Sequence, residues 1–272
     1  MNGRPTLMAV LAHPDDESLG TGGVLAKYAA EGAEVHLVTA TLGQRGWKGA
    51  KEAYPGPDAL GELREDELRA ACAALGVHEL TLLRYMDGAL DQVEPADAQR
   101  RIAGAIRSAR PDVVITFGPD GVYGHPDHIA VSQFTTAACL EAASEAGAEG
   151  TPAHRAAKAY YLAPPEDELA SYQAAFGDLK KRVGNVERRF PGWKDWAITT
   201  RVDTSAYVSK VWDAIRCHRS QLRDFEKLMN LPDEQRQRIF GQQTYYRAFS
   251  LVNGGSARET DLFAGIAEAT EA

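Results

Sequence analysis

Short runs of β-prone residues alternate with helix-like stretches through the first part of this chain of 272 residues. Such alternation predicts repeated strand–helix–strand units, whose right-handed crossovers leave few topologies open. Residues 112–117 (DVVITF) place apolar side chains on both faces, as expected of a strand inside a parallel sheet. We therefore predict an α/β fold with a Rossmann-like, doubly wound, mostly parallel sheet. The expected strands cover residues 7–11, 34–39, 79–83, 112–117 and 159–162, and the expected helices cover residues 17–30, 60–75, 96–109 and 129–146.

The length of the chain suits a single domain, 1–272, that buries one large core. We expect residues 1–146 to form the Rossmann-like core. After a linker of small residues at 147–152, residues 153–272 are expected to complete the sheet and the pocket.

The second part of the chain is less regular than the first. Its pattern predicts strands near residues 197–202 and 245–252, one long helix over 205–229, and no regular element over 164–196. Within the first part, residues 41–59 form a loop rich in Gly, Lys and Pro. This loop is too long for a simple connector, and loops of such length often cover active sites.

Composition restricts the partners that this chain can bind. A net charge of −8 gives no basic face for nucleic acid or for an anionic membrane. No apolar stretch has the length of a membrane helix, and the apolar run at residues 7–12 is shorter than the core of a signal peptide. We therefore expect a cytoplasmic protein that binds neither nucleic acid nor membranes, and the sequence leaves a homo-oligomer open.

Two polar segments follow the first and fourth expected strands. They are His13-Pro14-Asp15-Asp16-Glu17 and His125-Pro126-Asp127-His128. In the usual strand order of a doubly wound sheet these two strands flank the point where the order reverses, and ligands bind there beyond the strand ends. Imidazoles and carboxylates gathered in this way are the ligands of a catalytic metal ion, with carboxylates to spare for proton transfer. The sequence thus predicts a metal site at the carboxyl ends of strands one and four.

The two segments resemble the PIG-L/LmbE-like family of zinc-dependent N-acetylglucosaminyl deacetylases, which includes the deacetylases of mycothiol and bacillithiol synthesis. Two weaker pieces fit the same family: Arg64-x-x-Glu67-Leu68 ahead of Leu75-Gly76, and Cys217-His218-Arg219-Ser220-Gln221. The resemblance covers most of the chain.

The resemblance implies that His13, Asp16 and His128 hold one metal ion per chain. Two neutral imidazoles and one carboxylate suit a tetrahedral Zn²⁺ with its fourth position open to water, although Fe²⁺, Mn²⁺ or Co²⁺ accept the same ligands. The ion would lower the pKa of that water and stabilise the oxygen of a tetrahedral intermediate. Asp15, next to a ligand, would be the general base that takes the proton of the water.

Three further residues are implied to be catalytic. His125 would act as a cation or acid beside the oxyanion and the leaving amine. Asp127 is expected to hold the His125 ring and to raise its pKa. Tyr123 occupies the position of a tyrosine that helps to stabilise the oxyanion in the mycothiol-pathway enzymes.

Three residues are candidates for substrate binding. Arg64 lies on the apolar stripe of the expected helix over 60–75, where an inward arginine needs a polar partner; that partner is either a structural carboxylate or, as the resemblance favours, the substrate. Asp87 follows the third strand and is either a ligand of sugar hydroxyls or a carboxylate that stabilises a turn. His218 is equally a core histidine or a pocket residue.

The glycines of Gly20-Thr21-Gly22-Gly23 invite comparison with a dinucleotide site, but the GxGxxG order is absent and the tetrad lies inside an expected helix. We expect them to let that helix pack closely against the sheet or the metal loop.

Three functions compete. The leading one is a metal-dependent hydrolase that removes the N-acetyl group from an N-acetylglucosamine-type substrate. The second is an amidase that cleaves a larger acyl group from a glucosaminyl-cysteine conjugate, and it differs from the first in the depth of its pocket. The third is a non-catalytic Rossmann-like module that binds a nucleotide or a sugar, which predicts a protein without metal.

Overall fold

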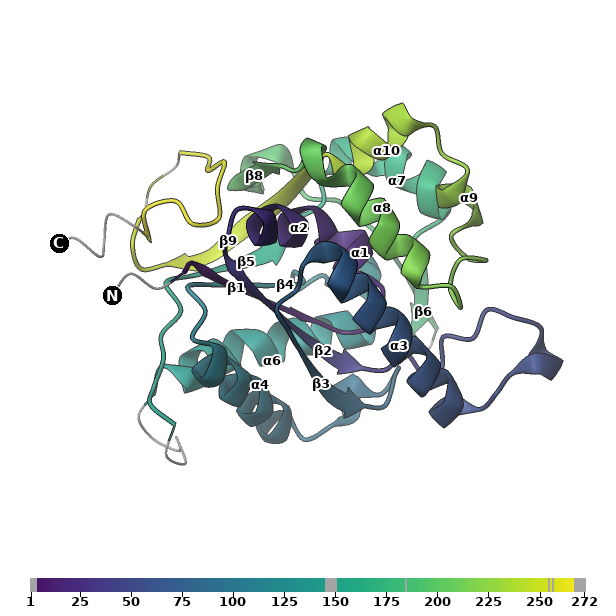
Figure 1. Ribbon diagram of the computed structural model, residues 1–272, viewed down its shortest axis with the longest axis horizontal. Helices are drawn as coiled ribbons and strands as arrows, with labels where there is room; N and C mark the ends of the chain where they lie inside the picture. Colours follow the sequence, from purple (N-terminus) through teal and green to yellow (C-terminus); the bar gives the residue numbers. More distant parts are fainter. Residues whose placement is uncertain (1–3, 145–150, 184, 254, 256, 267–272) are drawn as a thin grey trace.

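A seven-stranded sheet runs through the computed structural model, which describes residues 4–144, 151–183, 185–253, 255 and 257–266 (Figure 1). The strand order is β3-β2-β1-β4-β5-β9-β8. Neighbours from β3 to β5 are parallel, whereas β9 is antiparallel to both β5 and β8. The predicted α/β fold with a mostly parallel sheet is confirmed. The strands are β1 Thr6–Leu11, β2 Glu34–Thr41, β3 Glu79–Tyr85, β4 Val113–Thr116, β5 Lys158–Leu162, β8 Thr200–Asp203 and β9 Gln242–Ser250.

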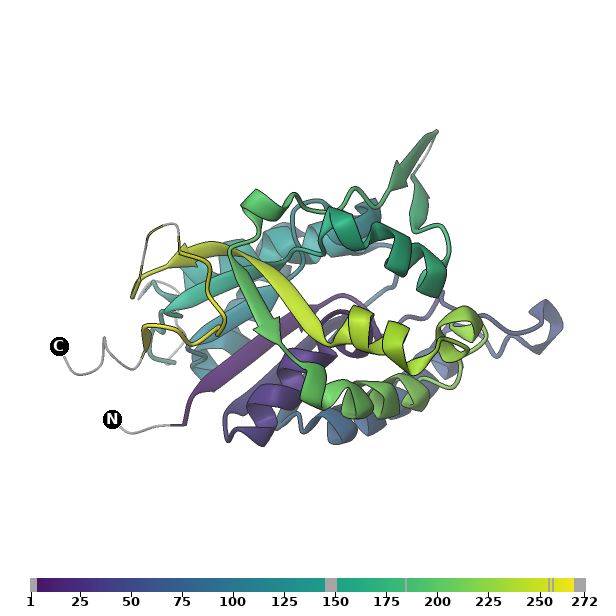
Figure 2. The same cartoon turned by 90° about the horizontal axis from the view of Figure 1, so that it is seen from above.

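Helices cover both faces of the sheet (Figures 1 and 2). On one face α2 and α3 pack against α8, and on the other face α4 packs against α6. Strand β1 is buried along its whole length between these layers, which explains why its side chains are apolar on both faces. Among the described residues, no helix combines the length and the apolar character needed to cross a membrane. The helices are α1 Asp16–Gly20, α2 Gly22–Ala30, α3 Pro57–Leu75, α4 Pro95–Ala109, α5 Gly121–Gly124, α6 Pro126–Ala142, α7 Leu169–Phe176, α8 Val208–Cys217, α9 Glu226–Met229 and α10 Asp233–Phe240.

The strand order reverses between β1 and β4. Strands β2 and β3 extend the sheet on one side of β1, and the chain then crosses over to place β4 and β5 on the other side. At the carboxyl ends the hydroxyl of Thr116 donates a 2.8 Å hydrogen bond to the carbonyl of Val10, which ties β4 to β1. The loops that follow these two strands therefore border one crevice, as the sequence predicted.

The helix expected over residues 17–30 is in fact two helices that meet at Thr21. A side chain at position 23 would collide with the next layer, because a Cβ on Gly23 would lie 2.7 Å from Thr204 Cβ. A Cβ on Gly22 would likewise lie 3.3 Å from Val211 of α8. A Cβ on Gly20 would lie 3.3 Å from Leu162 of β5, so the glycines allow close packing against the sheet, as expected, and also against α8 and Thr204.

The second half of the chain departs further from expectation. The prediction of one long helix over 205–229 is wrong. Helix α8 ends at Cys217, and residues 218–225 form turns before the short α9. The irregular segment 164–196 contains α7 and a hairpin of β6 (Lys180–Val183) and β7 (Val186–Arg189), which pairs apart from the main sheet. Of the linker expected at 147–152, residues 147–150 lie outside the described residues.

A buried polar cluster fastens the C-terminal segment to the sheet. Glu259 accepts hydrogen bonds from Lys158 Nζ at 2.5 Å, from the Tyr160 hydroxyl at 2.7 Å and from the Thr200 hydroxyl at 3.0 Å. Burial raises the pKa of Glu259, but the hydrogen bonds from Lys158 and Tyr160 outweigh burial and lower it to about 2. The negative charge of Glu259 therefore stabilises the folded protein.

This stabilisation should depend on pH. The pKa of Glu259 is about 2 in the folded protein and 4.5 without these contacts, so the contribution is complete above pH 4.5 and is lost as the pH falls toward 2. We expect the difference in unfolding free energy between wild type and Glu259→Gln to be about 2 kcal/mol smaller at pH 3 than near neutral pH, because about 1.5 of the 2.5 pKa units lie above pH 3. Urea unfolding near neutral pH and at about pH 3 measures it. An equal difference at both pH values would contradict this account.

Candidate metal centre

The two motif loops meet at the crevice between β1 and β4. His13 follows β1 directly, and Asp16 opens α1 three residues later. His125 is the N-cap of α6, so His128 lies in the first turn of that helix. Asp15 has a positive φ of 114°, a conformation rarely adopted by residues other than glycine, and it turns the chain sharply between strand and helix.

The side chains of His13, Asp16 and His128 form a triangle of ligand atoms. His13 Nδ1 lies 3.3 Å from His128 Nε2 and 3.4 Å from an oxygen of Asp16, whose other oxygen lies 3.5 Å from His128 Nε2. A tetrahedral ion with bonds of about 2.0–2.1 Å holds its ligand atoms about 3.3–3.4 Å apart. The three residues could therefore hold a small divalent ion such as zinc.

Carboxylates behind the triangle fix the His13 ring. His13 Nε2 lies 3.1 Å from Asp127 Oδ2 and 3.3 Å from Asp87 Oδ1, which leaves Nδ1 for the metal. The Asp127 carboxylate is itself held by the backbone N–H groups of Gly88 (2.6 Å) and Leu90 (3.1 Å). His13, His125 and Asp127 form a second group that could hold a metal ion. In that group, however, the Asp127 carboxylate already accepts the two backbone N–H groups and contacts His13. Asp127 is accordingly a positioning residue for His13.

This arrangement corrects the pairing expected for Asp127. Its carboxylate holds His13 and not His125, while its backbone N–H donates to His125 Nδ1 at 3.2 Å. The pKa of His125 is also not raised: burial, together with the charges of His128, His13 and Lys181, lowers it to about 3. His125 is therefore a neutral imidazole here.

The pKa values of His128 and Asp16 favour the protonation states that can bind a metal ion. Burial lowers the pKa of His128 to about 4, so its nitrogen is free of a proton. For Asp16, burial is outweighed by His128 and by hydrogen bonds from His13, and its pKa falls well below the usual range. Burial also disfavours the charged form of His13, but bonds to Asp127, Asp16 and Asp87 raise its pKa. The carboxylates of Asp16, Asp87 and Asp127 around His13 favour the binding of a cation between them.

Arg64 lies buried on α3 and holds the loop that carries Asp15. Its guanidinium donates to Asp15 Oδ2 at 3.0 Å, to the carbonyl of Pro14, and to the carbonyl of Gly43 at 3.0 Å. Burial raises the pKa of Asp15 to about 6, against the opposing charge of Arg64. Of the two partners expected for Arg64, the structure shows the carboxylate.

His218 and Glu17 form a second support behind Asp15. Fully buried His218 contacts Glu17 Oε1 through Nε2 at 2.7 Å, and Glu17 Oε2 accepts the backbone N–H of Asp15 at 2.9 Å. The two weaker motifs also meet, because Glu67 accepts both the N–H and the hydroxyl of Ser220. Of the two roles expected for His218, the structure shows the core histidine: it contacts Glu17 and does not line the cleft.

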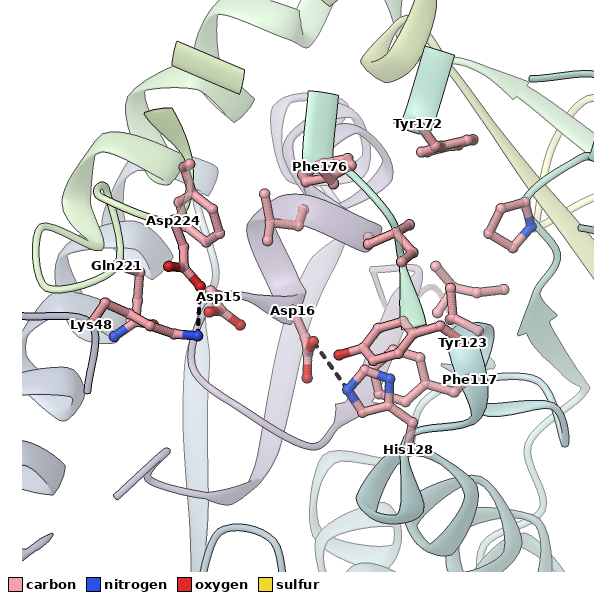
Figure 3. Close-up of a pocket in the computed structure, with 17 residues that line it drawn as sticks. Asp15, Asp16, Lys48, Phe117, Tyr123, His128, Tyr172, Phe176, Gln221 and Asp224 are labelled. Carbon is pink, nitrogen blue, oxygen red and sulfur yellow. Dashed lines mark ion pairs between the residues drawn. The ribbon is translucent and has the colours of Figure 1, made fainter. Parts of the chain in front are cut away.

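The cleft beside the triangle has two lobes that share Asp15, Asp16, Lys48, Tyr123 and Gln221. The polar lobe, about 440 Å³, is also lined by His13, Arg45, Arg64, Asp87, His125 and Lys181. The apolar lobe, about 330 Å³, is also lined by His128, Leu19, Phe117, Leu162, Tyr172, Phe176, Leu179 and Phe225. Figure 3 shows the apolar lobe, with the Tyr123 hydroxyl directed toward Asp16 and His128.

Sequence reasoning missed three cations of this cleft, Arg45, Lys48 and Lys181. Lys181, on β6, lies with its Nζ 3.0 Å from His125 Nε2, and Lys48, in the loop after β2, pairs with Asp224 at 2.5 Å (Figure 3). Lys181 stands in a strand of charged residues (KKRV) that carries no apolar periodicity. Lys48 lies in the loop over residues 41–59, which the sequence predicted to cover the site. The length of that loop was the one sequence signal that indicated a residue such as Lys48.

Fold and site together define a class of protein: Rossmann-like enzymes with a metal centre at the ends of β1 and β4. Residues 8–139 match the model of the PIG-L family, described as GlcNAc-PI de-N-acetylase. A Thermobifida fusca protein named 1D-myo-inositol 2-acetamido-2-deoxy-alpha-D-glucopyranoside deacetylase is 39% identical over 97% of this chain and 100% of the relative. A protein of that name from Thermomonospora curvata is 38% identical over 96% of each chain. The chain belongs to the PIG-L family, which confirms the resemblance and its class of activity, hydrolytic N-deacetylation.

Solved structures share the fold at lower identity. The N,N'-diacetylchitobiose deacetylase of Pyrococcus horikoshii superposes with a TM-score of 0.64 at 18% identity, over 89% of this chain and 83% of that one. The 4-carboxy-2-hydroxymuconate hydratase of Pseudomonas putida gives a TM-score of 0.70 at 20% identity, over 93% of this chain and 100% of that one. Because the fold serves both a deacetylase and a hydratase, the fold alone does not specify the reaction, which depends on the residues of the site.

We predict that wild-type protein retains one equivalent of divalent metal and that the double variant His13→Ala, His128→Ala retains none, because both imidazole ligands are gone. Asp127→Asn should weaken metal affinity by about 10–100-fold, since it loosens the His13 ring. Elemental analysis after dialysis against metal buffers measures both.

His125→Ala is the matched control, because it removes an imidazole from the same loop but outside the triangle. It should keep its metal. Stoichiometric metal in the double variant would show that other residues bind the ion.

Proposed function

We propose that this protein hydrolyses the N-acetyl amide of an N-acetylglucosaminyl substrate with a zinc ion held by His13, Asp16 and His128. The observation that carries the proposal is the triangle of ligand atoms beside the Asp15 carboxylate in an open cleft. An ion bound there would lower the pKa of a water molecule and polarise the amide carbonyl. The products are acetate and a free amine.

Asp15 is the proposed general base. Its carboxylate borders both lobes, so it reaches the point where water meets the amide carbon. Arg64 and Glu17 hold its side chain and its backbone N–H, which fixes its direction. The proton that Asp15 takes from the water is the proton that the leaving nitrogen needs when the C–N bond breaks.

His125 and Tyr123 are proposed to stabilise the negative charge on the carbonyl oxygen. Because the N–H of Asp127 donates to Nδ1, the neutral His125 ring carries its proton on Nε2, toward Lys181 in the polar lobe. Lys181 Nζ lies 3.0 Å from His125 Nε2, so both nitrogens border one point of the polar lobe, where a substrate oxygen beside them can accept from both. The Tyr123 hydroxyl is a third donor at the edge of the triangle.

The polar lobe suits a substrate rich in hydroxyl groups. Asp87, Arg45, Lys181 and Gln221 offer acceptors and donors around it. The curated relatives named above carry names that specify an inositol aglycone. We therefore propose a glucosaminyl-inositol conjugate as the substrate.

Substitution of the base tests the mechanism. Asp15→Asn keeps the shape of the side chain but removes its proton affinity, so we expect kcat to fall by about 10²–10⁴ with metal content unchanged. The released amine is measured by fluorescent labelling. Near-normal turnover at full metal occupancy would mean that another group activates the water.

The choice of substrate is tested separately. The kcat/KM should be highest for the N-acetylglucosaminyl-inositol conjugate, compared with N-acetylglucosamine, its disaccharide and the malate conjugate, because the inositol hydroxyls would bind in the polar lobe. Equal kcat/KM values across the series would show that the lobe does not recognise the aglycone.

A further inference from the structure

The apolar lobe is far larger than the reaction proposed above requires. A methyl group is about the size of a water molecule, which occupies roughly 30 Å³, whereas the lobe has a volume of about 330 Å³. Its walls come from α1, from the residues after β4 and β5, and from α7, so that it is a built part of the fold (Figure 3).

The orientation of the substrate follows from the polarity of the two lobes. Sugar hydroxyls lose their hydrogen bonds among Leu19, Phe176 and Phe225, whereas they find partners in the polar lobe. The glucosamine ring therefore belongs in the polar lobe. With the amide carbonyl at Asp15 and Asp16, which both lobes share, the acyl group points into the apolar lobe.

Aromatic packing closes the far part of this lobe. Tyr172 and Phe176 of α7 stack with ring centroids 6.4 Å apart, and Phe190 meets Tyr172 edge-on at 5.7 Å. Phe225 lies on the opposite chain segment, in the turn after α8, and belongs to the same apolar cluster. A flexible hydrocarbon chain would lie against these side chains and remove its surface from water.

We propose that the apolar lobe is an acyl subsite and that the enzyme hydrolyses glucosamine amides of medium-length, unbranched fatty acids more efficiently than the acetyl amide. The inference rests on the proposed function, since it uses the same reacting carbonyl. The bond broken is again the amide C–N bond, water supplies the oxygen of the carboxylate, and the amine keeps the proton. Leu19, Leu162, Tyr172, Phe176, Leu179 and Phe225 recognise the chain.

The test is a series of N-acylglucosamines from acetyl through butanoyl and hexanoyl to octanoyl, assayed with the metal-loaded enzyme. Since an added methylene in an apolar pocket commonly changes kcat/KM by about tenfold or more, we expect the octanoyl amide to exceed the acetyl amide by at least about tenfold. A parallel substrate, the octyl glycoside of N-acetylglucosamine, carries the same chain on the other side of the sugar. A gain for the octyl glycoside without one for the octanoyl amide overturns the proposal, because the lobe then takes the aglycone.

Variants locate the chain in the lobe. Leu179 is half-buried after α7, so Leu179→Trp fills the lobe, and the ratio of kcat/KM for octanoyl over acetyl should fall about tenfold or more. Leu140→Trp makes the same change at a position on α6 that is 72% exposed, and its ratio should stay at the wild-type value. Phe176→Ala enlarges the lobe, so with decanoyl and dodecanoyl amides added to the series its preferred chain length should lie beyond that of wild type. Ratios that are equal in wild type and in both lobe variants overturn the proposal.

Failure of this inference is distinct from failure of the proposed function. If wild type hydrolyses the acetyl amide and gains nothing from a longer chain, the acyl subsite is wrong and the deacetylase stands. If no amide is hydrolysed by metal-loaded protein, the proposed function fails, and calorimetric binding decides on the subsite. N-octanoylglucosamine must then bind more tightly than N-acetylglucosamine in wild type and lose that advantage in Leu179→Trp; equal binding overturns the subsite.

Discussion

The parallel pairing of β1 with β4 is the contact on which the rest of this structure depends. Ladder pairs such as Leu7 with Val113 and Ala9 with Ile115 align two strands that lie about a hundred residues apart in the chain. Both strands then end at the same edge of the sheet, and each releases its metal ligands there. The core of the protein thereby sets the distance between His13 and His128, and the bond from Thr116 to Val10 maintains that setting at the very end of the ladder.

Local patterns made the first half of the fold and the metal triangle predictable. Strands such as β1 are apolar on both faces, and HPDDE and HPDH bring their ligands with them. The partner of Asp127 was not predictable, because neighbours two positions apart on a helix point to different sides. His125 caps α6 while the Asp127 carboxylate faces the Gly88 loop. Lys181 was missed because its strand, KKRV, has no apolar face that would mark it in the sequence.

The two halves of the chain divide the work of the site. Residues before α7 supply the candidate ligands, the proposed base, its arginine and most of the polar lobe. Later segments add Lys181 and Gln221 to the polar lobe, and they add Tyr172, Phe176, Leu179 and Phe225 to the apolar lobe. The supports of Asp15 cross this division, because Glu17 binds His218 and Glu67 binds Ser220. The motif around His218 therefore couples the later half of the chain to the base, which explains why a buried histidine belongs to the pattern of an active site.

The loop after β2 has two parts, a root that Arg64 holds and a tip that Lys48 ties to Asp224. Gly43 and Gly46 lie so close to the guanidinium that a Cβ at either position would come within 2.0–2.3 Å of Arg64 Nη1. A side chain in the root would displace the arginine and, with it, Asp15. The tip, from Trp47 to Tyr54, carries no such link to the base. The length and the charge of the tip can therefore change during evolution. Such changes alter which molecules enter the cleft, whereas the residues proposed to carry out the reaction stay the same.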